Sequence, residues 1–491
     1  MKGPIGGKFM EPILDIAIDL PERGSREILR SLHRQLRSAI IDGRLQPGLR
    51  LPPTRALAEG LGISRNTVIA AYDMLLSEGY VEGRQGAGTY VADVRPRLER
   101  PKAPLQADPV SDKRLAPTWR GWRPLAETCS GETYRYDFVA GMPATEFPFD
   151  IWQRLSTRAA RAVARSGVYE HDPAGEPPLR EAIASHVSFV RAVACRPEDI
   201  VVTAGTRQAI DLIARILVTP GQTEVALEDP GYGPTRRSFI GAGAKVLSIP
   251  VDEEGLVVDR LPPSARIICI TPSHQFPLGV AMSARRRAAL LDFAESFGAV
   301  IVEDDYDSEF RHDRMPLDAL QTLDRSGSVF YVGTFSKSMF PALRMGFVVV
   351  PEWARYALTL AKQMNDWHNP LISQLALADF IAEGHLARHV RKMRRVYSAR
   401  HEALCAALNT HLSDRLRPFR AHAGVHLAAE LTVPKDEQQV VARAATRQMR
   451  VEDMARYASR DIAQKGLVFG FGMIEADNIE PAIKELAGVM M

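Results

Sequence analysis

A single lysine lies among small hydroxyl residues in the segment VGTFSKSMFPALRMG, residues 332–346. Lys337 follows Thr334 and Ser336, and Arg344 comes seven residues later. Apolar runs that predict strands flank the segment on both sides. A lysine between buried strands is costly unless it is paired, neutral or covalently used. Two interpretations follow: a surface lysine on a loop, or a lysine that forms an imine, with Thr334, Ser336 and Arg344 around a phosphate.

Short apolar runs alternate with helical segments from about residue 134 to the C-terminus. This alternation predicts an α/β fold whose mainly parallel sheet is covered by helices. The predicted strands are 200–203, 224–227, 245–247, 267–270, 300–302 and 329–331.

Side chains that suit one cofactor follow the ends of several of these strands, where doubly wound sheets bind ligands. Gly205 turns a strand into a helix whose free N–H groups suit a phosphate. Tyr232 offers an aromatic face, and a carboxylate at Asp304 could keep a pyridine nitrogen protonated. With Lys337, these groups are what pyridoxal phosphate requires. Taken singly, each residue also has a purely structural interpretation: Gly205 as a turn glycine, Tyr232 as a packed aromatic residue and Asp304 as a helix cap.

The N-terminal part of the chain has a different pattern. Apolar residues recur every four positions over residues 28–40, which predicts an amphipathic helix. Thr54 and Ser64 then stand as N-caps of two short helices joined by a glycine turn, the helix-turn-helix pattern. Predicted strands at 80–82 and 88–91 enclose a turn and would form a β-wing.

Composition and charge limit the class of protein. The chain has 491 residues, 46% hydrophobic and 25% charged, which suits a soluble protein of two or three domains. It has no apolar run of about 18 residues and no signal-peptide core, and its four cysteines make no metal or disulfide pattern, so we expect a cytoplasmic protein without a metal. Residues 21–100 contain 13 arginines, no lysine and nine acids, a usage that suits phosphate and guanine contacts as well as a solvated surface.

The segment LQPGLRLPPTRALAEGLGISRNTVIAAYDMLLSEGYVEGRQGAGTYVA resembles the winged helix-turn-helix of GntR-type regulators. The N-terminal end of the second helix is then expected in the major groove, where operator bases are read. The resemblance further implies a phosphate contact from the first short helix and a wing close to the minor groove. The expected DNA-binding residues are Arg55, Ser64, Arg65, Asn66, Thr67, Arg84, Gly86 and Gly88.

The motifs EDDYDSEFR, SHQFPLG and GTFSKSMFPALRMG resemble those of fold-type I, class I aminotransferases, and the whole chain resembles the MocR family of regulators. The family implies a winged helix-turn-helix fused to an α/β pyridoxal-phosphate transferase domain with a smaller C-terminal α+β subdomain. We expect a DNA-binding domain at 22–93, a linker rich in proline and charge at 94–133, and an effector and dimerisation domain at 134–491. Two tryptophans near 116–122 suggest that the end of the linker docks on a neighbouring domain.

The resemblance also assigns roles around the cofactor. Lys337 is implied as the imine lysine, Asp304 as the partner of the pyridinium nitrogen, and Tyr306 as a contact of the ring hydroxyl. Tyr232 is implied against the ring, with His274 and Gln275 close to it. The implied phosphate site consists of Gly205, Thr206, Arg207, Thr334, Ser336 and Arg344.

The sequence departs from the aminotransferase pattern at two positions. Leu278 stands where a threonine is common, and Val468 stands where an arginine usually binds the substrate carboxylate. Either another arginine replaces it or the effector is not a simple α-carboxylate. The candidates by residue type alone are Arg236, Arg237, Arg311 and Arg420.

Three functions remain open from the sequence. The first is a regulator that binds operator DNA as a head-to-tail homodimer and senses an amine or amino acid by imine exchange at Lys337. The second is a working aminotransferase with a DNA-binding appendage, against which Val468 argues because a poorly oriented substrate reacts slowly. The third is a sensor of pyridoxal phosphate itself.

Overall fold

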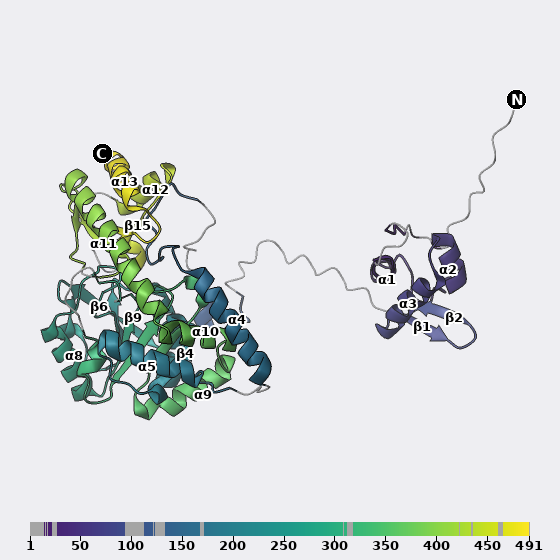
Figure 1. Ribbon diagram of the computed structural model, residues 1–491, viewed down its shortest axis with the longest axis horizontal. Helices are drawn as coiled ribbons and strands as arrows, with labels where there is room; N and C mark the ends of the chain where they lie inside the picture. Colours follow the sequence, from purple (N-terminus) through teal and green to yellow (C-terminus); the bar gives the residue numbers. More distant parts are fainter. Residues whose placement is uncertain are drawn as a thin grey trace. The chain divides into compact units, whose positions relative to one another are not determined.

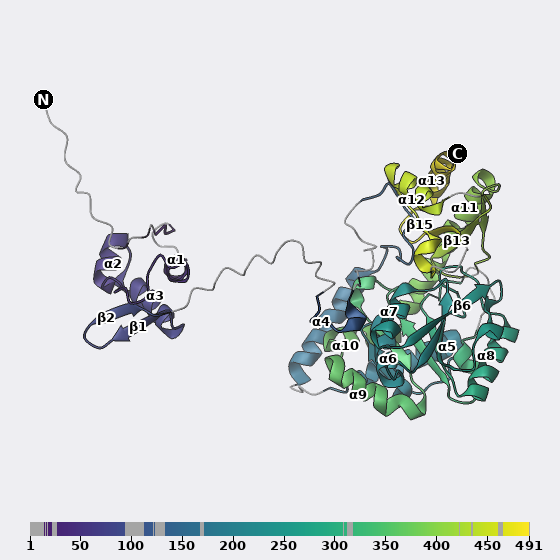
Figure 2. The same ribbon diagram turned by 180° about the vertical axis from the view of Figure 1, so that it is seen from behind.

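The computed structural model describes residues 14, 16, 18–21, 27–93, 112–120, 122, 133–166, 171–307, 309–311, 318–421, 423–433, 436–459 and 465–490. The chain divides into two compact units, one up to residue 115 and one from 116 onward. Figures 1 and 2 show the units from opposite sides. The division falls inside the expected linker, because residues 116–120 and Trp122 pack with the second unit.

The first unit is a winged helix-turn-helix, as the sequence predicts. Its apolar positions form one core, which includes Leu32 and Leu36 of the first helix and Val68 and Leu75 of the third. Thr54 was expected as an N-cap, but the second helix begins at Thr54 itself and Pro53 takes the cap position. The elements are α1 (Ile28–Ile41), α2 (Thr54–Leu61), α3 (Arg65–Ser77), β1 (Val81–Arg84) and β2 (Gly88–Val91).

The second unit is built on an eight-stranded sheet with the order β4-β11-β10-β9-β8-β5-β6-β7. Neighbours from β10 to β6 are parallel, β11 is antiparallel to both of its neighbours, and β7 is antiparallel to β6. All six strands predicted from the sequence are present. The strands are β4 (Ile200–Thr203), β5 (Glu224–Asp229), β6 (Lys245–Asp252), β7 (Gly255–Leu256), β8 (Ala265–Ile270), β9 (Val300–Asp305), β10 (Val329–Thr334) and β11 (Gly346–Val349).

Helices cover both faces of this sheet. One buried cluster joins α6, α7 and α9 to the sheet, and another joins α8 to it; Figure 2 shows α6 and α7, and Figure 1 shows α5 and α8 on the opposite side. The helices are α4 (Phe149–Ser166), α5 (Pro177–Arg191), α6 (Thr206–Leu217), α7 (Gly233–Gly241), α8 (Ala284–Phe297), α9 (Arg355–Asp366) and α10 (Leu371–Ala382).

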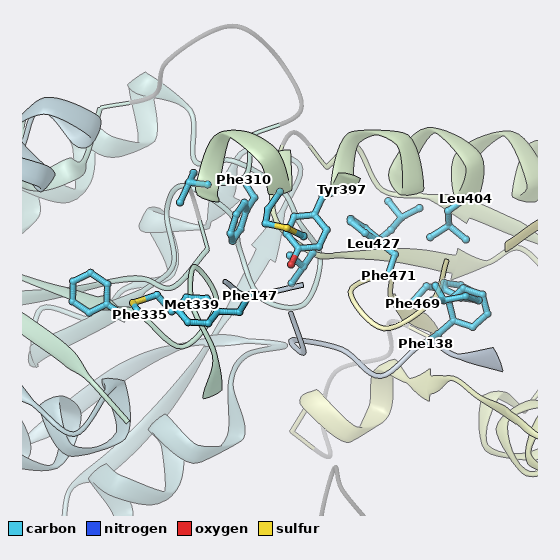
Figure 3. Close-up of a cluster of buried hydrophobic side chains, with 14 of the residues drawn as sticks. Phe138, Phe147, Phe310, Phe335, Met339, Tyr397, Leu404, Leu427, Phe469 and Phe471 are labelled. Carbon is cyan, nitrogen blue, oxygen red and sulfur yellow. The ribbon is translucent and has the colours of Figure 1, made fainter. Parts of the chain in front are cut away.

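The C-terminal part forms a smaller α+β subdomain around the sheet β12-β13-β16-β15. A core of aromatic and aliphatic side chains, among them Phe138, Tyr397 and Phe469, joins this subdomain to the larger one (Figure 3). A further pair of strands, β3 (Tyr136–Asp137) and β14 (Met449–Arg450), is parallel. The remaining elements are α11 (His385–His411), β12 (Leu416–Pro418), β13 (His426–Leu431), α12 (Glu437–Thr446), β15 (Glu452–Asp453), β16 (Gly466–Gly470) and α13 (Ala476–Val489).

The end of the linker docks on α7, as the two tryptophans suggested. The rings of Trp119 and Trp122 lie 5.1 Å apart, and both approach Gly241 at the end of the helix. The guanidinium of Arg237 lies 5.9 Å from the Trp122 ring centroid. This contact fixes the last part of the linker to the second unit.

In the part of the chain that the structure describes, no helix combines the length and the apolar character needed to cross a membrane.

Candidate functional site

Lys337 lies in the loop between β10 and β11 and is half-buried. Its Nζ donates a hydrogen bond to the backbone oxygen of Gly141, a partner that no sequence pattern indicated. Burial lowers the pKa of Lys337 below its usual value, although the carboxylates of Asp307 and Asp304 act in the opposite direction. A lowered pKa increases the neutral fraction of the amine, and neutral amines are the nucleophiles that attack carbonyl carbons.

Asp304 is the penultimate residue of β9, and one of its carboxylate oxygens lacks a partner in the part of the chain that the structure describes. Its side chain is buried, and Oδ1 has no hydrogen-bond partner among the described residues. Burial, together with the charges of Asp305, Asp307 and Glu228, raises its pKa from 3.8 to about 8. An unpartnered buried carboxylate is unfavourable. A protonated ring nitrogen would satisfy it, so this residue fits the implied cofactor.

The raised pKa of Asp304 makes a prediction for the cofactor-free protein. The folded state holds a proton that the unfolded chain loses at about pH 4, so stability falls as pH rises towards 8. Asp304→Asn has no such charge, and we expect it to be about 1–3 kcal/mol more stable than wild type at pH 9 and nearly equal at pH 4. Denaturant unfolding at the two pH values measures the difference.

The matched control is Asp211→Asn, because the Asp211 side chain on α6 is 44% exposed and pairs with Arg215 at 2.8 Å. It should show no such pH dependence. A pH-independent difference for Asp304→Asn would mean that the carboxylate finds a partner in solution.

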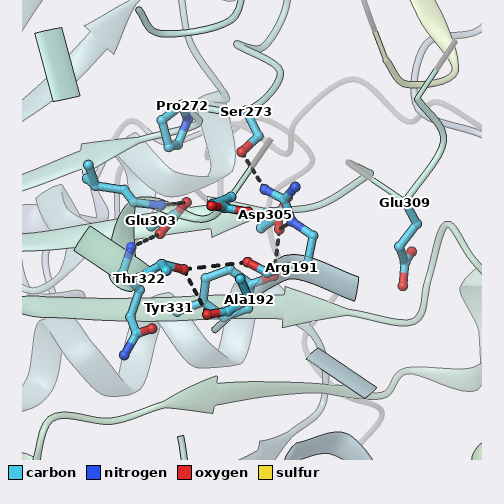
Figure 4. A network of polar contacts seen from close by, with 12 residues as sticks. Arg191, Ala192, Pro272, Ser273, Glu303, Asp305, Glu309, Thr322 and Tyr331 are labelled. Carbon is cyan, nitrogen blue, oxygen red and sulfur yellow. Dashed lines mark hydrogen bonds and ion pairs between the residues drawn. The ribbon is translucent and has the colours of Figure 1, made fainter. Parts of the chain in front are cut away.

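A buried ion network holds the two strand ends on which the site residues lie (Figure 4). Arg191 of α5 donates to Asp305 Oδ2 at 2.7 Å and to Ser273 Oγ at 2.6 Å. Tyr331 donates its hydroxyl to the same carboxylate at 2.5 Å. Successive residues of a strand point to opposite sides, so fixing Asp305 also orients Asp304. Ser273 fixes the loop that carries His274 in the same way.

Tyr306, His274 and Asp307 form a compact polar group. The hydroxyl of Tyr306 lies 2.9 Å from His274 Nδ1, and the two oxygens of Asp307 lie 3.0 and 3.1 Å from the same nitrogen. His274 and Asp307 are almost fully buried. The carboxylate therefore orients the imidazole, and the imidazole positions the tyrosine hydroxyl that is implied to contact the cofactor ring.

Tyr232 and Glu228 line a small cavity that reaches Asp304, Cys269 and Thr271. Tyr232 is the residue before α7, and its ring meets Phe276 edge-on at 5.6 Å. Glu228 accepts hydrogen bonds from Thr271 N and Oγ1, and burial raises its pKa to about 7. Tyr232 thus shares a cavity with Asp304, and its expected place against the ring stays a prediction.

Gln275 has a structural task in the same region. Its amide nitrogen donates to the backbone oxygens of Pro230 and Phe276 at 2.9 and 2.7 Å, and its oxygen accepts from Leu278 N at 3.1 Å. The side chain is fully buried. Gln275 therefore holds the loop after β8 in place, and the expected contact with the cofactor stays a prediction.

We expect an anion site where β4 turns into α6. Gly205 has φ 90°, a conformation that favours glycine, and it is the N-cap of that helix. The first N–H groups of a helix have no partner within it, so they suit an anion. Arg344 donates to the backbone oxygen of Ala204 at 2.8 Å, next to this helix end. After burial and the two carboxylates, the positive charges of Arg207 and Arg344 also lower the pKa of Lys337.

The remaining members of the expected phosphate site lie on the same two segments. Thr334 donates its hydroxyl to Ser336 Oγ at 3.1 Å, and Ser336 N donates to Thr334 Oγ1 at 3.2 Å. Thr206 is the first residue of α6. Two cations, a helix N-terminus and paired hydroxyls make a site that fits a phosphate.

None of the four candidate arginines contacts Val468 among the described contacts. Arg236 lines the cavity that Tyr232 and Asp304 share, but it donates to Ser248 at 3.0 Å and lies 3.6 Å from the buried carboxylate of Asp229. Arg237 lies over Trp122, and Arg420 is exposed. Arg311 forms an isolated β-bridge with Ala423.

In the first unit, the expected DNA-binding residues lie on exposed surface around the start of α3. Ser64, Arg65 and Asn66 are exposed and Thr67 is half-buried. Ser64 caps α3 by accepting from Thr67 N at 3.1 Å, which fixes the helix end. Arg55, ion-paired with Glu59, lines a surface hollow together with Arg65.

The wing carries the other three expected contacts. Gly86 and Gly88 have φ 75° and 112°, which only glycine adopts readily, so they set the tight turn between β1 and β2. Arg84 is exposed, pairs with Glu82 at 2.7 Å and lies 4.5 Å from the Tyr90 ring centroid. The Arg84 guanidinium is therefore held at the surface, where a DNA phosphate can replace Glu82 as its partner.

Several site residues were missed by the sequence reasoning. Gly141 is 196 positions from Lys337, and no local pattern identifies a backbone acceptor. Asp307 was one acid of the run EDDYD, and strand alternation does not extend into the loop where it meets His274. His426 is buried beside His274, with ring centroids 4.7 Å apart, and only the folded subdomain brings it there.

Comparison with known proteins agrees with both units. A family model described as aminotransferase class I and II matches residues 147–454, and one described as bacterial regulatory proteins, gntR family, matches residues 30–91. The chain is 39% identical to a Rhizobium meliloti protein described as "Probable rhizopine catabolism regulatory protein MocR", over 98% of this chain and 96% of that protein.

A second relative and one solved structure extend the comparison. The chain is 32% identical to the "HTH-type pyridoxine biosynthesis transcriptional regulator PdxR" of Corynebacterium glutamicum, over 97% of this chain and 98% of that protein. The crystal structure of Pyrococcus horikoshii kynurenine aminotransferase in complex with PMP has a TM-score of 0.68 and 25% identity, and the match covers 73% of this chain and 91% of that chain.

Proposed function

The chain belongs to the MocR family of transcriptional regulators, and on that premise we propose that it couples operator binding to a small amine or amino-acid effector at Lys337. Two observations at the ends of the adjacent strands β9 and β10 carry the proposal. Lys337 is half-buried, bonded to Gly141 and has a lowered pKa, and the buried Asp304 has one oxygen, Oδ1, without a partner among the described residues. An ordinary surface lysine would need neither burial nor such a neighbour.

The second unit is an aminotransferase-type domain of the pyridoxal-phosphate-dependent kind. Asp304 would hold the ring nitrogen, Tyr306 the ring hydroxyl, and the anion site around Gly205 and Arg344 the phosphate. When bound, the cofactor supplies an aldehyde that bonds reversibly to amines and absorbs near-visible light. Lys337 would hold that aldehyde, and an amine effector would compete with the lysine for it.

Helix α7 connects this site to the end of the linker. It begins directly after Tyr232, which lines the cavity beside Asp304, and it ends at Gly241 against Trp119 and Trp122. We propose that a shift of Tyr232 on effector binding moves α7 and the tryptophans docked on it. Such coupling requires that the effector bind two arrangements of these elements with different affinity.

A homodimer is supported by an apolar stripe on α9. Tyr356, Leu360 and Met364 recur every four residues on one face, and Tyr356 and Met364 are 81% and 78% exposed. Trp353 and Trp367 extend the stripe at both ends. Aromatic and methionine side chains of this kind are enriched in protein interfaces. We propose that a second copy of the chain covers the stripe and that the two winged helices bind two operator half-sites.

The experiment that tests the proposal follows the near-visible spectrum and operator affinity of the full chain together while amines and amino acids are added singly. One compound should shift the Lys337-dependent absorption and change the operator affinity over the same concentration range. A spectrum that no compound shifts, with affinity that responds to pyridoxal phosphate alone, would identify the cofactor as the signal. Repeated turnover of an amino donor and a keto acid would instead identify an enzyme.

Arg65 is predicted to read a base from the exposed N-terminal end of α3. Because a bidentate contact with guanine discriminates by about 1–3 kcal/mol, Arg65→Ala should weaken operator binding by about that amount. The control is binding to DNA without the operator sequence, which should change much less. An operator affinity that stays at the wild-type value would exclude this role for Arg65.

A further inference from the structure

The two positions that depart from the aminotransferase pattern share one buried cluster. Val468 and Leu278 are 0% and 1% exposed, although they lie 190 residues apart in the chain. They pack in a cluster whose buried members are Val251, Leu278, Val280, Ala428, Met454 and Val468. The slot that would hold a cation is therefore filled by aliphatic side chains.

The register of the small sheet shows which side chains flank Val468. Ala428 of β13 and Glu452 of β15 are both paired directly with Val468 of β16. Residues opposite each other in antiparallel strands project from the same face. His426 is two residues from Ala428 and projects from that face too. Next to Val468 this face presents an alanine, an acid and an imidazole. Its arginine, Arg417, lies further along at the surface, where it pairs with Glu430 at 2.5 Å.

The acid in this row is buried and already bonded. Glu452 is 4% exposed, and its Oε2 accepts from the Tyr457 hydroxyl at 2.6 Å and from Ala140 N at 3.3 Å. Its Oε1 lies 3.4 Å from Arg456, so the guanidinium of Arg456 is paired with this carboxylate. Ala140 precedes Gly141, whose oxygen accepts from Lys337, and the face therefore borders the loop that holds the lysine.

The imidazole offers no positive charge in compensation. Burial, the neighbouring His274 and the charge of Lys337 hold the pKa of His426 well below its usual value, so its ring is neutral at physiological pH. Its Nε2 lies 3.1 Å from the backbone oxygen of Pro277. A carboxylate placed against this face would meet an aliphatic wall, a neutral ring and a second carboxylate, and an unpaired buried charge is strongly unfavourable.

Because this face combines aliphatic side chains with an acid and a neutral ring, we propose that the effector is a primary amine that carries no carboxylate. The inference rests on the proposed function and narrows it, because it separates amines from amino acids. The amino group of the effector reaches the position of Lys337, and the rest of the molecule lies beside Ala140 and Gly141, with the uncharged cluster of Leu278 and Val468 buried behind them.

The test uses pairs of an α-amino acid and the amine left when its carboxylate is removed: alanine with ethylamine, serine with ethanolamine, and leucine with 3-methylbutylamine. For each compound, the concentration that half-shifts the spectrum of the full chain is divided by the value for free pyridoxal phosphate, which corrects for amine basicity. In at least one pair, the corrected value should be about tenfold lower for the amine. A preference for the amino acid in the pairs that respond would overturn the proposal.

A substitution at Val468 tests whether this face disfavours a carboxylate. Val468→Arg should move the preference about tenfold toward the amino acid, because a bidentate guanidinium would then face the carboxylate. The control is Thr432→Arg, which adds the same charge at the exposed end of β13 and should leave the preference unchanged. A folded Val468→Arg protein with the wild-type preference would overturn the proposal, and if this variant does not fold, the wild-type series decides.

Different outcomes would overturn the proposed function and the proposed effector class. Wild-type protein without any Lys337-dependent absorption would overturn the proposed function and this inference with it. Normal absorption combined with amino-acid preference would overturn the inference alone.

Discussion

Replacement of Lys337 by alanine is expected to remove the near-visible absorption of the lysine-bound cofactor completely. Part of the cofactor should remain, because Asp304 and the anion site around Gly205 and Arg344 do not depend on the lysine. Borohydride reduction should attach the cofactor covalently to the wild-type chain, and peptide mass analysis should find it on Lys337. The same treatment of Lys337→Ala should give no stable adduct.

The structure supplies a matched control for this substitution. Lys392 is exposed and pairs with Glu146 at 3.1 Å on the surface. Lys392→Ala should keep the wild-type spectrum and the wild-type adduct. An unchanged spectrum in Lys337→Ala, or an adduct on another lysine, would show that the buried lysine is structural.

Much of the fold was predictable because its signals are local. Each of the six predicted strands lies inside an observed one, since buried parallel strands are short continuous apolar runs between helices. The winged helix-turn-helix was predictable for the same reason, and Ser64 caps α3 as expected. Thr54 was wrong as a cap because Pro53, with φ near −55°, is already shaped to precede a helix and leaves Thr54 inside it.

The candidate site was predictable where a residue follows a strand, and not where it depends on the second subdomain. Asp304, Tyr306 and Lys337 all stand at strand ends of one sheet, so their meeting follows from the topology. Gly141, His426 and Glu452 reach the site only through the packing of the C-terminal subdomain. Sequence reasoning could name the absence of an arginine at position 468, but the acid opposite it required the register of β15 and β16.

The isolated winged helix is expected to bind an operator with two half-sites far more weakly than the full chain does. The first unit has its own core, including Leu32, Val68 and Leu75, so residues 1–110 should fold alone. Two heads held in one dimer bind the second half-site at a high effective concentration, which contributes about 10²–10⁴ in affinity. Titration of the fragment and the full chain against two-site and one-site DNA measures this, and the difference should nearly vanish on one site.

The α9 stripe allows the same loss to be produced within the full chain. Tyr356→Glu combined with Met364→Glu places charges on the exposed apolar face and should yield monomers whose operator affinity falls to that of the fragment. Phe189→Glu is the control, because Phe189 is 92% exposed on α5 and outside the stripe. If the double variant stays dimeric, the contact between copies lies elsewhere. If the fragment alone equals the full chain on two-site DNA, then the large unit does not bring the two heads together, and the effector would have to act on a single head through the linker docked at Trp119 and Trp122.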